Sequence, residues 1–112
     1  MESEKRRYVR VPFLSVFCAE EENVEPHNEV FRIIDISLGG IGATSHMQFD
    51  KGQYIKGFCR FDGEWIPATL RIAWQKQDGK RYAFGCEIVN PSRLLQNAIK
   101  KEVLKGQLLF AK

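Results

Sequence analysis

Two Asp-Gly pairs inside apolar, alternating segments constrain the fold of this chain more than any other feature. Asp62-Gly63 joins the strand-like segments Tyr54–Phe61 and 64–74. Asp78-Gly79 leads into a third such segment, 81–89. A type I′ turn requires positive φ at both central positions, so Asp-Gly between alternating segments is a strong hairpin signal. The second half of the chain is therefore predicted to form consecutive antiparallel strands.

The first half of the chain carries the same strand-length alternation, interrupted by turns. Val11–Ala19 and 30–36 are predicted strands, and a short strand at 41–44 follows the turn 37–40. Pro67 lies inside one of the hairpin strands and marks a sheet edge or a bulge, because proline has no backbone N–H. Six short, turn-linked strands predict a mainly β fold, a small antiparallel β-barrel.

Near the end of the chain the apolar period changes from two residues to about four. Apolar side chains recur there at every fourth position: Leu95, Ile99 and Val103. Asn90-Pro91 is a predicted N-cap and first helical residue, and Gly106 a predicted stop, which gives an α-helix at about 91–105. The apolar tail Leu108-Leu109-Phe110 would pack on the barrel or on a second copy, so we expect a monomer or a homodimer.

Length and charge narrow the class of protein. The chain has 112 residues, enough for one domain with a modest core. It has no apolar run of about 18 residues, so we expect no membrane insertion. No apolar stretch of signal-peptide type follows the N-terminus, which predicts a cytoplasmic protein. The net charge of +3 is too small to favour a general nucleic-acid coat protein.

The residues that usually carry metal or enzyme chemistry are scattered. Cys18, Cys59 and Cys86 are far apart, show no metal-ligand spacing, and are predicted to be buried free thiols. His27 and His46 lie alone in predicted loops and are given no chemical role. The sequence contains no credible nucleophile–base pair and no paired catalytic carboxylates. We therefore expect a protein that is not an enzyme, with no catalytic residue, no metal site and no cofactor.

Two short segments suit a phosphorylated guanine ligand. The arginine motif is Arg6-Arg7-Tyr8-Val9-Arg10, and the aspartate motif is Asp35-Ile36-Ser37-Leu38-Gly39-Gly40. Guanidinium groups bind phosphate oxygens and the O6/N7 edge of guanine through two parallel hydrogen bonds. An aspartate can accept from the guanine N1 and N2 hydrogens. Glycines allow backbone N–H groups to approach a ligand closely.

In this order and strand context, the two motifs resemble the RxxxR and (D/N)xSxxG motifs of the PilZ domain family of bacterial cyclic di-GMP receptors. Arg71-Ile72-Ala73-Trp74 is similar to a later strand of that family, and 82–88 to its last strand. The resemblance covers nearly the whole chain. It implies a six-stranded antiparallel split β-barrel with a C-terminal α-helix, in agreement with the strands predicted above.

The resemblance also implies a division of the chain and a role for eight residues. Residues 1–10 would form a flexible, ligand-binding arm, and 11–112 a single PilZ-like barrel domain with its helix. The implied site residues are Arg6, Arg7, Arg10, Asp35, Ser37, Gly39, Gly40 and Trp74. The arginines would hold guanine and phosphate, and Asp35 would accept from the Watson–Crick edge of a guanine.

The other implied roles are less direct. Ser37 would bond a phosphate or the base edge, or steady Asp35. The two glycines of the motif would let the turn approach the ligand. Trp74 would stack on a guanine, which contributes ~1–3 kcal/mol per base, or would equally serve barrel packing. Gly85 is interpreted as structural.

The implied function is that of a cyclic di-GMP receptor acting as an adaptor. Ligand would order the arm onto the barrel and change the surface offered to an unidentified effector protein, in motility, attachment or polysaccharide control. One alternative is a PilZ-fold protein-interaction domain without useful nucleotide affinity. Another, a barrel that binds a nucleic acid polymer, is disfavoured because aromatic residues are not interleaved with the basic cluster beyond Tyr8. Whether one nucleotide binds, or two, stays open.

Overall fold

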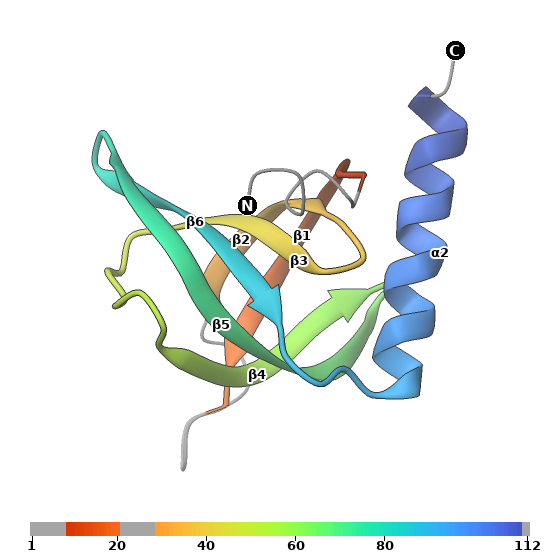
Figure 1. Cartoon of the computed structure of the whole chain (residues 1–112), viewed down its shortest axis with the longest axis horizontal. Helices are drawn as coiled ribbons and strands as arrows, with labels where there is room; N and C mark the ends of the chain where they lie inside the picture. Colours follow the sequence, from red (N-terminus) through yellow and green to blue (C-terminus); the bar gives the residue numbers. More distant parts are fainter. Residues whose placement is uncertain (1–8, 21–28, 111–112) are drawn as a thin grey trace.

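The computed structural model describes residues 9–20 and 29–110, and this part of the chain forms six strands and one α-helix (Figure 1). The elements are β1 (Val11–Ala19), β2 (Glu29–Ile36), β3 (Gly40–Ser45), β4 (Tyr54–Phe61), β5 (Glu64–Asp78), β6 (Arg81–Ile88) and α2 (Arg93–Phe110). All paired strands are antiparallel, and the order β1-β2-β3-β6-β5-β4 closes into a barrel. The predicted mainly β fold, a six-stranded antiparallel barrel followed by a helix, is confirmed.

Asp62-Gly63 forms the turn between β4 and β5, and Gly79-Lys80 forms the turn between β5 and β6, directly after Asp78 ends β5. Asp62 and Gly63 have φ values of 48° and 79°, and Gly79 has a φ of 64°. These left-handed conformations match what tight hairpin turns require. β4 and β5 then pair without a bulge from Tyr54 opposite Arg71 to the turn itself. The hairpin signals in the sequence therefore set the register of this half of the barrel.

The β5 strand is longer than predicted and carries its proline at a local edge. It reaches Asp78 because β6 pairs with it as far as Arg81. Pro67 pairs with β4 on one side, while the β6 ladder begins only at Leu70. The edge position predicted for Pro67 is confirmed, and no register shift accompanies it.

The barrel interior holds one hydrophobic core. Phe17, Phe31 and Phe84 are among its largest fully buried side chains. The Phe31 ring lies 5.2 Å from the Phe84 ring in an edge-on arrangement. Fully burying one such side chain stabilises the fold by roughly 1.5–3 kcal/mol. The alternation of buried and exposed positions along each strand fixes which residues point outward. The candidate site is built from some of these outward residues.

The three cysteines are buried free thiols, as predicted. Cys59 and Cys86 belong to the core, and burial raises the pKa of each thiol to about 12. Neighbouring thiols contribute a smaller part of the pKa rise at Cys59. These two thiols are therefore protonated packing groups in the folded protein.

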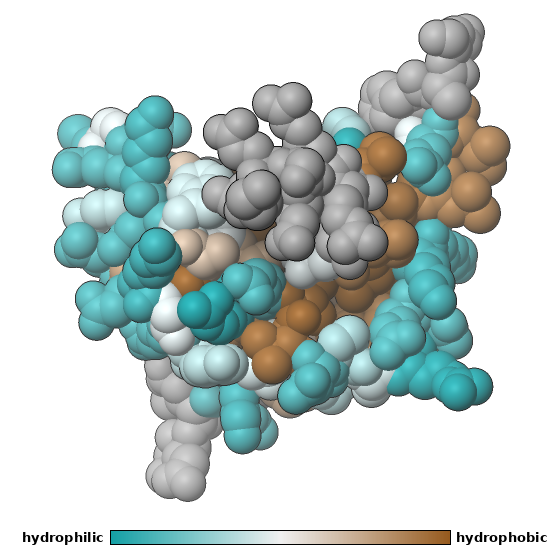
Figure 2. All heavy atoms as spheres, in the orientation of Figure 1, coloured by the Kyte–Doolittle hydropathy of each residue, from teal (hydrophilic) through white to brown (hydrophobic). Residues whose placement is uncertain are grey.

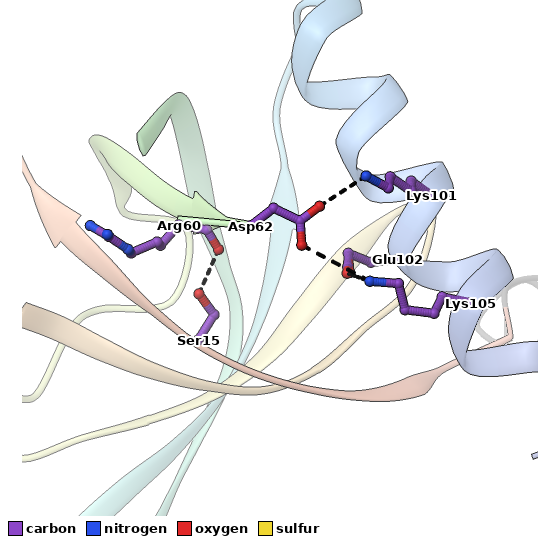
Figure 3. Close-up of polar contacts among 6 residues, drawn as sticks. All are labelled: Ser15, Arg60, Asp62, Lys101, Glu102 and Lys105. Carbon is purple, nitrogen blue, oxygen red and sulfur yellow. Dashed lines mark hydrogen bonds and ion pairs between the residues drawn. The ribbon is translucent and has the colours of Figure 1, made fainter. Parts of the chain in front are cut away.

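The barrel closes less tightly between β1 and β4 than elsewhere. The ladder between them joins three residue pairs, Phe17 to Ala19 opposite Gly57 to Cys59. Beyond it, the Ser15 hydroxyl donates to the Arg60 carbonyl at 2.6 Å (Figure 3). A side chain thus bridges the seam where the backbone ladder has ended.

Ion pairs tie α2 to the turn between β4 and β5. Lys101 Nζ donates to Asp62 Oδ2 at 3.0 Å, and Lys105 Nζ lies 4.0 Å from Asp62 Oδ1 (Figure 3). The hydrogen bond from Lys101 lowers the pKa of the Asp62 carboxyl. These groups are exposed, so the apolar face of the helix, rather than the ion pairs, holds it on the barrel.

The helix begins later than predicted. The backbone N–H of Leu95 donates to the Ser92 hydroxyl at 3.1 Å, which makes Ser92 the N-cap. Asn90 instead takes a left-handed conformation, with φ 42°, in the connection from β6. The assignment of Asn90 as cap and Pro91 as first helical residue is therefore wrong. Serine two residues on offers the same capping oxygen in a better place.

The helix also continues past its predicted stop. It runs through Gly106 to Phe110, so the predicted end at about 105 is wrong. Gly106 is buried, and a Cβ atom there would lie 2.5 Å from the Val11 Cβ. Glycine thus serves close packing against β1. Leu108 and Leu109 are helical and exposed, and Figure 2 shows apolar surface gathered along this part of α2.

Candidate functional site

The arginine and aspartate motifs meet where β1 begins. Pro12 pairs with Asp35 of β2, so the chain before β1 enters the barrel beside the aspartate. Arg10 Nη1 donates to Asp35 Oδ1 at 2.6 Å, and the two side chains are 47% and 32% exposed. An exposed pair of this kind adds about 0–1 kcal/mol to stability, so a ligand can replace it at little cost. Arg6 and Arg7 lie outside the described residues.

The turn after Asp35 is closed by the Ser37 side chain. The Gly39 N–H donates to Ser37 Oγ at 3.3 Å, and Ser37 Oγ donates to the Gly40 carbonyl at 3.4 Å. The Ser37 N–H donates to the same carbonyl at 2.9 Å, and the residue is buried. In this structure Ser37 shapes the turn. Gly40 is held by packing, since a Cβ there would collide with the Cys86 carbonyl on β6.

A cross-strand row connects Asp35 to Trp74 on the outer face of the barrel. Asp35 pairs with Gly42 of β3, Gly42 with Gly85 of β6, and Gly85 with Trp74 of β5. The flanking residues of β3 and β6 belong to the core, so this row points outward. Three strand spacings separate its ends, about 14 Å. We refer to Gly42 and Gly85 as the glycine floor.

Side chains from the neighbouring strands lie over both residues of the glycine floor. A Cβ on Gly42 would lie 2.5 Å from an Asp35 carboxylate oxygen, and a Cβ on Gly85 would collide with Trp74 Nε1. Trp74 is nevertheless 46% exposed. Its indole therefore both packs on the barrel, over Gly85, and offers exposed surface. The Asp35 carboxylate and the Trp74 indole thus lie directly over the two glycines, which are buried beneath them.

Sequence reasoning did not find the glycine floor. Gly42 was not singled out, and Gly85 was interpreted as structural. A glycine at an outward position inside a strand signals a close approach of other groups. Aligning the two glycines with Asp35 and Trp74 requires the register shifts beside Asp35 and beside Trp74, which no local pattern reveals.

A second outward row borders the first. Arg71 pairs with Glu87, and Arg71 Nη1 donates to Glu87 Oε1 at 2.8 Å. Glu87 is opposite Gly40, and Arg71 is opposite the exposed Tyr54. The charges of Arg71 and Glu87 offset each other. Among the described ion pairs, Arg10 is therefore the cation that faces Asp35.

The described residues also bear on metals and membranes. Residues 9–20 and 29–110 contain no cluster of three or more His, Cys, Asp or Glu side chains suited to a metal ion. Within the same ranges, no helix has the length and apolar character needed to cross a membrane.

Comparison with known proteins places the chain in a family. The PilZ domain model matches residues 4–105, which include both motifs and all six strands. The chain belongs to the PilZ family. A search of curated protein sequences finds no match to it. The predicted family is thereby confirmed over most of the chain.

Several solved PilZ proteins share this fold. The Bacillus subtilis inhibitor of motility MotI/DgrA superposes with a TM-score of 0.76 at 19% identity, over 96% of this chain and 53% of that one. The Escherichia coli YcgR PilZ domain with cyclic di-GMP gives 0.68 at 17% identity, over 94% and 93%. MrkH, a cyclic di-GMP-dependent transcription regulator, gives 0.68 at 18% identity, over 94% and 52%. The chain therefore spans about half of MotI and MrkH and nearly all of the isolated YcgR domain.

Proposed function

We propose that this PilZ protein is a cyclic di-GMP receptor that acts as an adaptor. The observation that carries the proposal is the meeting of both motifs in the Arg10–Asp35 ion pair, at one end of the glycine floor. The YcgR PilZ domain, which has this fold, was solved with cyclic di-GMP. Its identity of 17% supports the fold alone, so the ligand is argued from the site's own chemistry.

Each described side chain offers a complementary contact to the nucleotide. The Asp35 carboxylate accepts hydrogen bonds from guanine N1 and N2, a donor pair that adenine lacks. Arg10, released from Asp35, turns its guanidinium to a phosphate oxygen or to the guanine O6/N7 edge. Trp74 presents an exposed indole for a base, and stacking of this kind contributes about 1–3 kcal/mol.

The turn residues act through the backbone. Ser37 fixes the turn with its hydroxyl. It thereby positions Asp35, which lies two residues earlier at the end of β2. Gly39 and Gly40 leave this turn without side chains on the ligand side. Arg6 and Arg7 lie outside the described residues, and we propose that they add guanidinium contacts from the arm, 1–10.

Arm ordering would couple ligand to output. The arm joins β1 beside Asp35, so a ligand held by Arg10 and Asp35 lies within reach of Arg6 and Arg7. Folding the arm over the ligand changes the surface offered to an effector protein. We propose that the signal passes by protein contact, through this changed surface.

Isothermal titration with cyclic di-GMP tests the receptor proposal, and separate titrations with GTP and cyclic di-AMP are the controls. We expect saturable binding of cyclic di-GMP alone. Arg10→Ala and Asp35→Ala should each weaken binding at least about tenfold, since each loses about 1.5 kcal/mol or more of charge-assisted hydrogen bonding. Asp62→Ala is the matched control, because it removes an exposed, ion-paired aspartate from the turn beside α2.

The outcome separates the receptor from the second candidate, a PilZ-fold protein-interaction domain. The observation that favours this candidate is that Arg10 and Asp35 already satisfy each other. Absence of binding heat at two temperatures, with folded protein, would reject the receptor. Equal affinity in wild type and in both site variants would reject the assignment of the site.

A further inference from the structure

A second cluster of cationic groups lies outside both motifs, towards the end of β3. It surrounds a cavity of about 140 Å³, formed where the start of β2, the residues after β3 and the start of β6 come together. The residues that line it are Val30, Arg32, Ser45, His46, Met47 and Arg81. None of these six is acidic. The cavity lies well below the roughly 300–1,000 Å³ of small-molecule sites, so its size suits a small ion or a single chemical group.

Arg81 is held in this cluster by neutral partners. Its Nη1 atom lies 2.5 Å from His46 Nε2, and its Nη2 atom donates to Thr44 Oγ1 at 3.2 Å. A guanidinium has only donors, so His46 Nε2 is the acceptor and the ring is neutral in this arrangement. Two neutral acceptors orient the guanidinium and leave its positive charge in place. Sequence reasoning gave His46 no role; here it positions an arginine.

A second arginine belongs to the lining of the cavity. Arg32 lines it from β2, and Arg32 pairs in register with Thr44, the acceptor of Arg81. Arginines that converge on one small space present their N–H forks in the geometry that tetrahedral oxyanions need. We propose that Arg32, His46 and Arg81 form an oxyanion site that takes a phosphate group, separate from the site of the two motifs.

The two sites adjoin each other on the barrel. Thr44 follows Gly42 of the glycine floor by two residues on the same face of β3, about 7 Å along the strand. A phosphate in the cavity therefore comes either from free phosphate or from a second nucleotide bound beside the first. Both sources share the chemistry, and the experiment tells them apart.

The test is a titration of the ¹⁵N-labelled chain with inorganic phosphate, followed by amide shifts. Sodium chloride at equal ionic strength is the reference. We expect saturable shifts at residues 44–47 and 81. Arg81→Gln should weaken phosphate binding at least about tenfold, and His46→Ala should weaken it because Arg81 loses its orienting acceptor. Arg60→Gln is the matched control: it removes one arginine on β4, where Arg60 stacks over Trp65 at 4.8 Å.

Cyclic di-GMP titrations of wild type and Arg81→Gln identify the source. A stoichiometry that falls from two to one assigns the cavity to a second nucleotide. An unchanged stoichiometry with loss of phosphate binding assigns it to free phosphate. Shifts that do not saturate, that chloride reproduces, or that Arg60→Gln reduces as much as Arg81→Gln would overturn the proposal. Arg10→Ala should leave phosphate binding intact, which separates this result from a failure of the receptor proposal.

Discussion

Gly85 and Trp74 form one unit in the candidate site. A Cβ atom on Gly85 would occupy the place of the Trp74 indole, so Gly85→Ala must displace the ring. If Trp74 stacks on a guanine, losing about 1–3 kcal/mol weakens cyclic di-GMP binding roughly 5- to 150-fold. Titration calorimetry measures the affinity, and indole fluorescence reports the displacement.

A double-mutant cycle sharpens this prediction. Trp74→Ala should weaken binding as much as Gly85→Ala does, and the double variant should lose no more than either single variant, because both changes remove the same contact. Full additivity would mean that Gly85 affects the ligand by another route. Unchanged affinity in Trp74→Ala would leave the indole as barrel packing.

The buried thiols make stability depend on alkaline pH. Burial raises the pKa of the Cys86 thiol from an ordinary value of 9.0 to about 12. The folded state therefore holds this proton more tightly than the unfolded state. The resulting stabilisation is complete below pH 9 and is lost as the pH rises from 9 towards 12.

Denaturant unfolding at pH 8 and pH 10.5 measures this effect. The free energy of unfolding should fall between the two pH values, and it should fall less in Cys86→Ala, because one of the raised thiols is gone. Cys86→Ala itself is less stable at both pH values. The comparison is therefore between the pH-dependent changes in the free energy of unfolding of the two proteins. If wild type and variant lose the same free energy of unfolding between the two pH values, the pKa of Cys86 does not differ between the folded and unfolded states.

At the residue scale, the sequence predicted the charged residues of the site better than it predicted the glycines on which neighbouring side chains pack. Arg10 and Asp35 stand in recognisable motifs, and the structure brings them into contact. From the sequence alone, the Ser37 hydroxyl could bond either the ligand or its own turn, and the folded structure shows the bonds within the turn. The glycine floor matters because Gly42 pairs with Asp35 and Gly85 pairs with Trp74, and these pairings depend on the strand register.

At the scale of elements, Gly106 tests how α2 is held. In an isolated helix Gly106→Ala would be favourable by up to about 1 kcal/mol. Here the new methyl group would meet Val11 at 2.5 Å from Cβ to Cβ. Overpacking of this kind costs about 1–3 kcal/mol, so we expect a net loss of stability.

Thermal unfolding compares Gly106→Ala with Gln107→Ala, the next residue along the exposed side of the helix. The first variant should lower the midpoint by several degrees, and the second should leave it nearly unchanged. A higher midpoint in Gly106→Ala would mean that α2 moves freely enough to accept the methyl group, and that its contact with β1 is loose.

Helices and strands were predictable where the local sequence alone determines them. β1 has its predicted bounds, and both predicted hairpins form, one with its turn at Asp62-Gly63 and one with its turn at Gly79-Lys80, because alternation and turn conformation are local properties. The end of α2 was not predictable, since glycine signals a helix stop and a close contact alike. The length of β5 depends on its partner β6, which a single segment does not reveal.

At the scale of the whole molecule, ring closure brings distant segments to one outer surface. β2, β3, β6 and β5 are adjacent in the barrel although β4 separates β3 from β5 along the chain. Asp35, the glycine floor and Trp74 thus lie in one row, and the arm enters beside its first member. A ligand on this row can act on the arm without any change inside the barrel.

Ordering of the arm by ligand is the prediction for the whole molecule. Fixing residues 6–10 costs about 5–10 kcal/mol of backbone entropy at roughly 1–2 kcal/mol per residue. Charge-assisted hydrogen bonds contribute about 1.5–3 kcal/mol each, so Arg6, Arg7 and Arg10 offset this cost if they form about four bonds with the ligand. The balance is close to zero, so ligand decides the state of the arm.

Amide hydrogen exchange of residues 6–10, measured with and without cyclic di-GMP, checks this prediction. Exchange should slow on binding in wild type, and Asp35→Ala, which weakens the ligand, should need a higher concentration for the same protection. Core amides of β6 serve as the internal reference, because a general rise in stability would slow them too. If residues 6–10 are already protected without ligand, the arm is not the switch, and the signal to an effector must come from the bound nucleotide itself.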